Sequence, residues 1–207
     1  MPADRALIVV DMQNDFMPGG ALAVPEGDTI VETINRLARR FSNVVLTQDW
    51  HCPGHASFAS SHPGREVYET FDAFYGPQVL WPDHCVMGTP GADLHPGLDI
   101  PHAGLILRKG YHKEVDSYSA FLEADRKTRT GLDGWLASRG ITDIVVCGVA
   151  TDFCVGWTAC DARHFGLTVS VVEEASRGID LDGSMARAQR NMDIAGVNVV
   201  TMSQLVD

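Results

Sequence analysis

The sequence has few basic residues and no long apolar run, and both shortages exclude classes of protein. Only 16 lysines and arginines stand against 27 aspartates and glutamates, for a formal net charge of -11. Because nucleic-acid binding needs a basic face, we expect no nucleic-acid partner. No apolar run approaches the roughly 18 residues of a membrane span, and Asp11 interrupts the first one too early for a signal peptide. The sequence therefore predicts a soluble cytoplasmic protein without a membrane partner.

Paired cysteine motifs are also missing. The five cysteines are odd in number and form no C-x-x-C pair, which argues against a disulfide framework or a zinc ribbon. We expect free thiols. With 207 residues, of which 45% are hydrophobic and 21% charged, the chain fits one globular domain spanning 1–207.

Short β-branched runs alternate along the chain with amphipathic stretches of helical spacing. The strand-like runs are 6–10, 44–47, 104–107, 144–148, 168–172 and 197–200, and the helical stretches are about 29–40, 131–139, 153–164 and 184–194. This alternation predicts the α/β class, as a three-layer α/β/α sandwich around a six-stranded, mostly parallel sheet.

One long segment, about 50–103, interrupts the alternation and is called the insertion below. It has no long periodic run and holds seven of the ten prolines. Irregular loops of this length within a compact domain are usually functional. We therefore expect the insertion to contribute to a site.

The first four strand-like runs are each followed within a few residues by a group capable of chemistry. These groups are Asp11, the pair Asp49 and His51, Lys109, and Cys154. In open α/β sheets, ligands bind beyond the carboxyl ends of the strands, so these side chains are expected to converge. The chain is therefore interpreted as an enzyme.

Cys154 is the strongest candidate nucleophile. The sequence VVCGVATDFC runs from a strand into a helix that Thr151 and Asp152 can cap, which places Cys154 in the first helical turn. The helix dipole supplies only about 0.3 to 1 kcal/mol, less than one pKa unit at about 1.36 kcal/mol per unit. A nearby cation is needed to activate the thiol, and Lys109 can supply it. The alternative is a cysteine that only packs in the core.

Asp11 follows its strand directly, where a carboxylate is costly to bury unless it is paired. Lys109 or the Cys154 thiol can pair with it, and a carboxylate near a thiol can take its proton and pass it to a leaving amine. Taken alone, Asp11 fits a turn or helix-capping residue equally well. Together with Lys109 and Cys154 it favours catalysis.

A second group of polar residues predicts a metal site. Asp49 and His51 lie two residues apart and share one face of an extended segment, and His84 can join them from within the insertion. Two histidines and a carboxylate suit a divalent transition metal such as zinc, iron or manganese. His55 is either a fourth ligand or a hydrogen-bonding residue behind the ligands, and we favour the second. A polar surface loop is the alternative.

Several motifs in order resemble those of one enzyme family. DMQNDF, TQDWH, WPDHCV, GTPGADLHP, DSYSAF and GVATDFC closely resemble the nicotinamidase branch of the isochorismatase-like cysteine hydrolases. The resemblance runs from the first strand through the helix after Cys154. Its paired metal motif separates this branch from relatives that lack the motif.

The resemblance implies roles for individual residues. Asp11, Lys109 and Cys154 match the family's catalytic triad, and Asp49, His51 and His84 match its metal ligands. The backbone amides of Ala150 and Cys154 match the oxyanion hole, with a cis peptide expected between Val149 and Ala150. The positions lining the ring pocket are matched by Phe16, Trp81, Tyr118 and Phe153.

The resemblance also implies a reaction, namely metal-dependent deamidation of nicotinamide to nicotinate and ammonia through a thioester, a step of NAD salvage. Zinc is the first expectation for the metal, with iron and manganese open, and pyrazinamide is expected as a second substrate. A homo-oligomer is left open. Two alternatives are kept: an amidase for carbamoyl-amines or ureides on the same scaffold, and a non-enzymatic metal or redox module.

Overall fold

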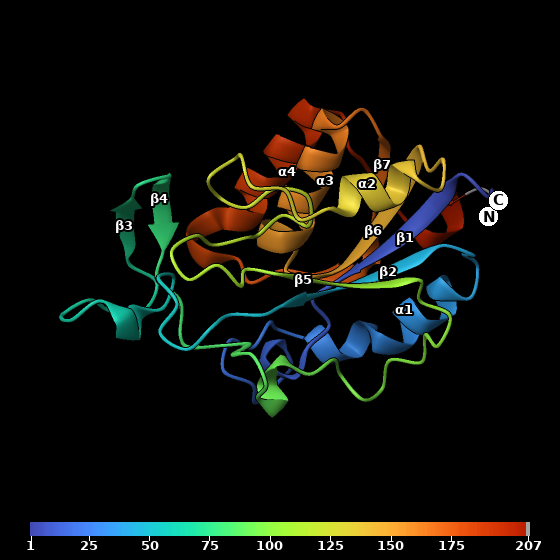
Figure 1. The fold of residues 1–207 in the computed structure, drawn as a ribbon. Helices are drawn as coiled ribbons and strands as arrows, with labels where there is room; N and C mark the ends of the chain where they lie inside the picture. The colour runs from blue at the N-terminus through green and yellow to red at the C-terminus, as the bar shows by residue number, and fades with distance from the viewer. Residues whose placement is uncertain (206–207) are drawn as a thin grey trace.

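The computed structural model describes residues 1–205, and its centre is one six-stranded parallel sheet (Figure 1). The strand order is β5-β2-β1-β6-β7-β8, and every neighbouring pair is parallel. The strands are β1 Arg5–Val10, β2 Val44–Asp49, β5 Leu105–Lys109, β6 Asp143–Val149, β7 Thr168–Arg177 and β8 Asn198–Val200. All six predicted strands are confirmed, and the sheet is parallel throughout rather than mostly so.

Helices cover both faces of the sheet, which confirms the predicted three layers. The helices are α1 Val31–Ala38, α2 Leu132–Ala137, α3 Gly156–His164 and α4 Ser184–Ala195. Figure 1 shows α1 on one side of the sheet and the other three helices on the opposite side. Successive β1 residues alternate between the two layers, so Leu7 packs in the core on the α1 side and Ile8 in the core on the α2 and α3 side.

The insertion contains a hairpin that its sequence does not predict. Strands β3 Thr70–Ala73 and β4 Gly76–Val79 form a two-stranded antiparallel sheet, which projects from the body of the molecule in Figure 1. The hairpin lacks a sequence signal because each strand has only four residues, and β4, with the sequence GPQV, carries no alternation of apolar and polar side chains. No helix within residues 1–205 is long and apolar enough to cross a membrane.

The order of the strands brings their carboxyl ends together. β5, β2, β1 and β6 are neighbours in the sheet, so the groups at their ends meet at one edge. Asp49 and Lys109 are the last residues of their strands and pair in register, rather than lying in the loops beyond. At the same edge, Gly148 lets β6 approach β1, since a Cβ there would lie 2.1 Å from the Val10 carbonyl oxygen.

Candidate active site and metal centre

Lys109 lies at the centre of a fully buried group of reactive side chains at this edge. Its Nζ lies 2.9 Å from Asp11 Oδ2 and 3.4 Å from Cys154 Sγ. It also donates hydrogen bonds to the Ser117 carbonyl, at 2.9 Å, and to Asp49 Oδ1. The side chain is 0% exposed, and a buried ammonium requires such partners. The structure therefore brings the three predicted triad residues together.

The two oxygens of the buried Asp11 carboxylate have different surroundings. Oδ1 accepts a hydrogen bond from the Thr47 hydroxyl at 2.6 Å, and the Thr47 oxygen in turn accepts the Asp11 backbone N–H at 3.1 Å. Oδ2 is buried and accepts no well-directed hydrogen bond from the described residues, although it faces the Lys109 ammonium. A lone pair on Oδ2 is thus free to take a proton.

Cys154 lies in the helical turn Thr151–Val155, directly before α3. Burial raises the pKa of its thiol well above the ordinary value, while the Lys109 charge opposes that rise. The Lys109 charge is shared between two carboxylates, so it does not ionise the thiol by itself. A raised pKa means that the thiol needs a base to become a thiolate, and the Asp11 carboxylate lies within 4.8 Å of the sulfur.

The predicted cap of this helix is wrong. Neither Thr151 nor Asp152 makes a side-chain cap at the start of the turn or of α3. The Asp152 carboxylate instead accepts the backbone N–H groups of Ile179 and Asp180 and the Ser184 hydroxyl. These distant partners, unknown from the local sequence, fix the loop before α4 against the turn that carries Cys154.

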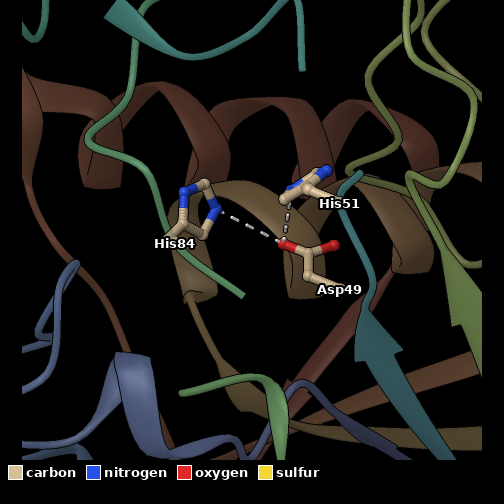
Figure 2. A group of neighbouring side chains, drawn as sticks. All are labelled: Asp49, His51 and His84. Atoms are coloured by element: carbon tan, nitrogen blue, oxygen red, sulfur yellow. Dashed lines mark ion pairs between the residues drawn. The ribbon is translucent and has the colours of Figure 1, made fainter. Parts of the chain in front are cut away.

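The three predicted metal ligands, Asp49, His51 and His84, lie together and could hold a metal ion (Figure 2). Asp49 Oδ2 lies 3.6 Å from His51 Nε2 and 3.7 Å from His84 Nε2. Each Nδ1 faces a carbonyl oxygen at 2.8 Å, Gly110 for His51 and Pro82 for His84. A carbonyl only accepts, so each Nδ1 carries the proton, and the Nε2 lone pairs face the shared centre.

This group of residues fits a divalent cation. Two ligands about 2.1 Å from an ion at a tetrahedral angle lie about 3.4 Å apart, close to the separations found here. The buried carboxylates of Asp11 and Asp49 face one ammonium, that of Lys109, which leaves one uncompensated negative charge. Asp49 divides its oxygens between the two groups, with Oδ1 on Lys109 and Oδ2 toward the histidines.

His55 lies beside His51 and outside the group of Asp49, His51 and His84. Its Nδ1 accepts the Ser57 backbone N–H at 3.2 Å and lies 2.8 Å from the Ser57 hydroxyl, while Nε2 donates to the His112 carbonyl at 3.0 Å. Both ring nitrogens are therefore engaged. The ring packs on His51 with centroids 4.4 Å apart, and that His55 supports His51 rather than binding the ion stays a prediction.

A small cavity opens beside Cys154, and aromatic rings form much of its wall. All four predicted ring-pocket residues line it, namely Phe16, Trp81, Tyr118 and Phe153. The Trp81 and Phe153 rings lie 4.9 Å apart and nearly perpendicular. Ala150 and Cys154 border the same cavity, as do Asp49 and His84, and the Val149–Ala150 peptide bond is cis as expected. Flat apolar walls of this kind suit a flat ring.

Gln78 of β4, which no sequence pattern indicated, is hydrogen-bonded to two residues of this wall. Its buried amide donates to Asp116 Oδ2 at 2.7 Å and lies 3.0 Å from the Tyr118 hydroxyl. Trp81 Nε1 donates to the same hydroxyl at 2.9 Å. Through Gln78, the hairpin is thus hydrogen-bonded to Asp116 and Tyr118, which both line the cavity. A signal for Gln78 was absent because the hairpin itself was not predicted.

Comparison with known proteins identifies the family. The model of the isochorismatase domain matches residues 5–204. The chain belongs to the isochorismatase family. A nicotinamidase of Acinetobacter baylyi is 52% identical over 97% of this chain and 94% of its own length. A solved nicotinamidase/pyrazinamidase of Acinetobacter baumanii has a TM-score of 0.98 at 54% identity, with 100% of both chains covered.

Two further solved members of the isochorismatase family contain ligands. A protein of L. infantum in complex with nicotinate has a TM-score of 0.86 at 38% identity and covers 100% of this chain and 97% of its own. A pyrazinamidase of Pyrococcus horikoshii in complex with zinc has a TM-score of 0.78 at 36% identity and covers 96% and 99%. The present chain resembles each of these two proteins along nearly its whole length.

Proposed function

We propose that the protein is a metal-dependent cysteine amidohydrolase that converts nicotinamide to nicotinate and ammonia, and pyrazinamide to pyrazinoate. The observation that carries this proposal is the buried Asp11–Lys109–Cys154 group, which shares Asp49 with the metal site and opens on an aromatic cavity. The high identity to nicotinamidases supports the choice of substrate. We further propose that one domain holds the complete site.

The first half of the reaction forms a thioester. Asp11 Oδ2 takes the proton of Cys154, and the sulfur attacks the carboxamide carbon of the substrate. The backbone N–H groups of Ala150 and Cys154 donate to the oxygen that becomes negative. When the tetrahedral intermediate collapses, the carbon–nitrogen bond breaks, and the amine takes the proton from Asp11 and leaves as ammonia. Once Asp11 holds the proton, the negative charge is on the sulfur, and the Lys109 ammonium, 3.4 Å from Sγ, stabilises it.

The second half hydrolyses the thioester. Asp11, again a carboxylate, takes a proton from water, and the hydroxide attacks the acyl carbon. The carbon–sulfur bond breaks, the proton on Asp11 returns to the Cys154 sulfur, and the product acid gives its remaining proton to solvent as it leaves as nicotinate. One carboxylate thus acts as base and acid in both halves, which is why its free Oδ2 matters.

Asp49, His51 and His84 would hold the metal, for which we propose zinc, with iron or manganese as alternatives. When bound, the ion supplies a Lewis-acidic position for the pyridine nitrogen of the substrate. Because Asp49, His84 and Cys154 border one cavity, a ring anchored on this side presents its carboxamide near the thiol. Phe16, Trp81, Tyr118 and Phe153 line the cavity that would receive the ring.

Ammonia release from a panel of amides tests the choice of substrate. We expect the metal-loaded protein to release ammonia from nicotinamide and pyrazinamide far faster than from benzamide, which has no ring nitrogen. Carbamoyl-amines and ureides should not react. Release from a ureide but not from nicotinamide would show that the scaffold serves another amide.

Replacing Asp11 with asparagine should lower kcat by about 10²- to 10⁴-fold, the usual contribution of a general acid–base. Burial raises the pKa of Asp11. The base must be unprotonated in the free enzyme, so a raised pKa moves the acid limb of the wild-type kcat/KM profile upward from the ordinary aspartate range. Steady-state kinetics across pH measure both effects, and Asp11→Asn retaining wild-type turnover would remove Asp11 from the mechanism.

A further inference from the structure

The loop that follows β1 contacts two of the metal-bearing segments through Gln13 and Asp15, neither of which is a ligand. We propose that Gln13 and Asp15 are positioning residues for the metal centre, which hold Asp49 and His84 at the separation a cation needs. The proposal rests on the metal site of the proposed function and not on the choice of substrate.

Gln13 acts on Asp49 in place of a missing strand partner. The β1–β2 ladder pairs no residue beyond Val9 and Leu46, because the chain leaves β1 at Asp11, whose φ is +49°. Gln13 Oε1 accepts the Asp49 backbone N–H, and its Nε2 donates to the Asp49 carbonyl, both at 2.8 Å. The buried side-chain amide thus fixes the end of β2 on the side that β1 has left.

The remaining hydrogen of Gln13 anchors the same amide to a third segment. Nε2 also donates to the Ala92 carbonyl at 2.8 Å. Both amide hydrogens and the amide oxygen therefore have backbone partners, so Gln13 has no donor left for a ligand. Its contacts serve to hold Asp49, whose Oδ2 faces the two histidines.

Asp15 acts on the segment that carries His84. Its Oδ2 accepts the backbone N–H of Cys85 at 2.7 Å, and the Cys85 carbonyl accepts the His51 backbone N–H at 3.0 Å. Cys85 has a φ of +46°, which a non-glycine residue keeps only when its surroundings hold it. Asp15 therefore fixes, through Cys85, the distance between the two ligand-bearing segments.

Two neighbouring features agree with this role. Phe16, from the same loop, packs its ring edge-on to His84, with centroids 5.6 Å apart. Gly91 lies so close to Asp15 that an added Cβ would come within 2.2 Å of Asp15 Oδ2. Even an alanine at position 91 would therefore displace the Asp15 carboxylate. This provides a way to move Asp15 without changing its chemistry.

The readout is the rate at which zinc leaves the folded protein in excess chromophoric chelator, which requires no substrate. Residues that orient metal ligands typically contribute about 10- to 100-fold to affinity, so we expect Gln13→Met to release zinc faster by about that factor. Gln48→Met is the matched control. Gln48 is also buried, and its side chain donates to the same Ala92 carbonyl at 3.0 Å, but the described side-chain hydrogen bonds of Gln48 do not include Asp49. Zinc release from Gln48→Met should therefore match that of the wild type.

The role of Asp15 is tested by the same measurement, the rate of zinc release into chelator. Asp15→Ala and Gly91→Ala should both release zinc faster, and Asp15→Asn, which keeps an acceptor for the Cys85 N–H, should restore much of the retention. Asn14→Ala is the control, since the Asn14 side chain is partly exposed and donates to the Pro90 carbonyl, at 2.7 Å, and not to a metal-bearing segment. The melting temperature of each metal-free protein separates a lost positioning role from a general loss of stability.

The proposal is overturned if Gln13→Met and Asp15→Ala fold and release zinc at the wild-type rate. It is equally overturned if each control loses zinc as fast as its partner variant. Where Gln13→Met does not fold, Gln13→Asn, one methylene shorter, takes its place. If the zinc-loaded wild-type protein does not hydrolyse nicotinamide, the proposed substrate is wrong. Faster zinc release from Gln13→Met and Asp15→Ala than from their controls would still support the positioning role.

Discussion

Replacing Cys154 with alanine will lower the rate of ammonia release from nicotinamide by at least about 10⁴-fold, the scale of loss seen when a covalent nucleophile is removed. The reason is that no other sulfur or hydroxyl among the described residues contacts the Lys109 ammonium as Cys154 does, at 3.4 Å. The metal content should stay at the wild-type level, because the thiol is not a ligand of the Asp49–His51–His84 site. Ammonia assays and metal analysis of the same preparation measure both.

Cys160→Ala is the matched control for this prediction. Cys160 lies in the neighbouring helix α3, partly exposed and outside the active-site cavity, so its loss should leave turnover unchanged. Ammonia release by Cys154→Ala near the wild-type rate would remove the cysteine from the chemistry and with it the thioester.

Changing His51 to alanine will empty the metal site. His51 supplies one of two imidazoles, and a site reduced to one histidine and one carboxylate holds a divalent ion far more weakly than a complete one. We expect metal content to fall to a small fraction of an equivalent after dialysis, and kcat/KM for nicotinamide to fall by at least about 100-fold. Excess zinc should restore part of the activity.

The control for His51 is His62→Ala. His62 is also in the insertion and also bonds a carbonyl through one ring nitrogen, that of Ala56 at 2.7 Å, but it is not among the metal-site residues. Its variant should keep both metal and activity. Full metal occupancy in His51→Ala would mean that other residues hold the ion.

The strands and the meeting of reactive groups were predictable from local sequence because both follow from simple periodicity. β-branched runs mark buried parallel strands, and parallel strands bring their carboxyl ends to one edge, so Asp11, Lys109 and Cys154 had to approach one another. The metal set was predictable for a similar reason. Asp49 and His51 share a face of an extended segment, and only His84 had to come from a distant position.

The rest depends on contacts between segments remote in sequence. Asp152 looked like a helix cap because Asp is common there, but its partners are three groups beyond β7. Gln13 and Gln78 have no local pattern, since each acts by reaching a backbone or hydroxyl group that only the folded chain places nearby. Side-chain amides that hold site residues through hydrogen bonds are therefore the part of the site that is hardest to predict from a sequence.

Mass spectrometry of the acid-quenched reaction can detect the proposed thioester between Cys154 and the nicotinoyl group. Metal-loaded protein is mixed with nicotinamide, quenched at a series of early times and digested. We expect one peptide, the one containing Cys154, to carry a nicotinoyl group, and this adduct to be absent from Cys154→Ala. Nicotinate formation with the nicotinoyl group on another residue, or with no acyl adduct at any time, would contradict the proposed thioester.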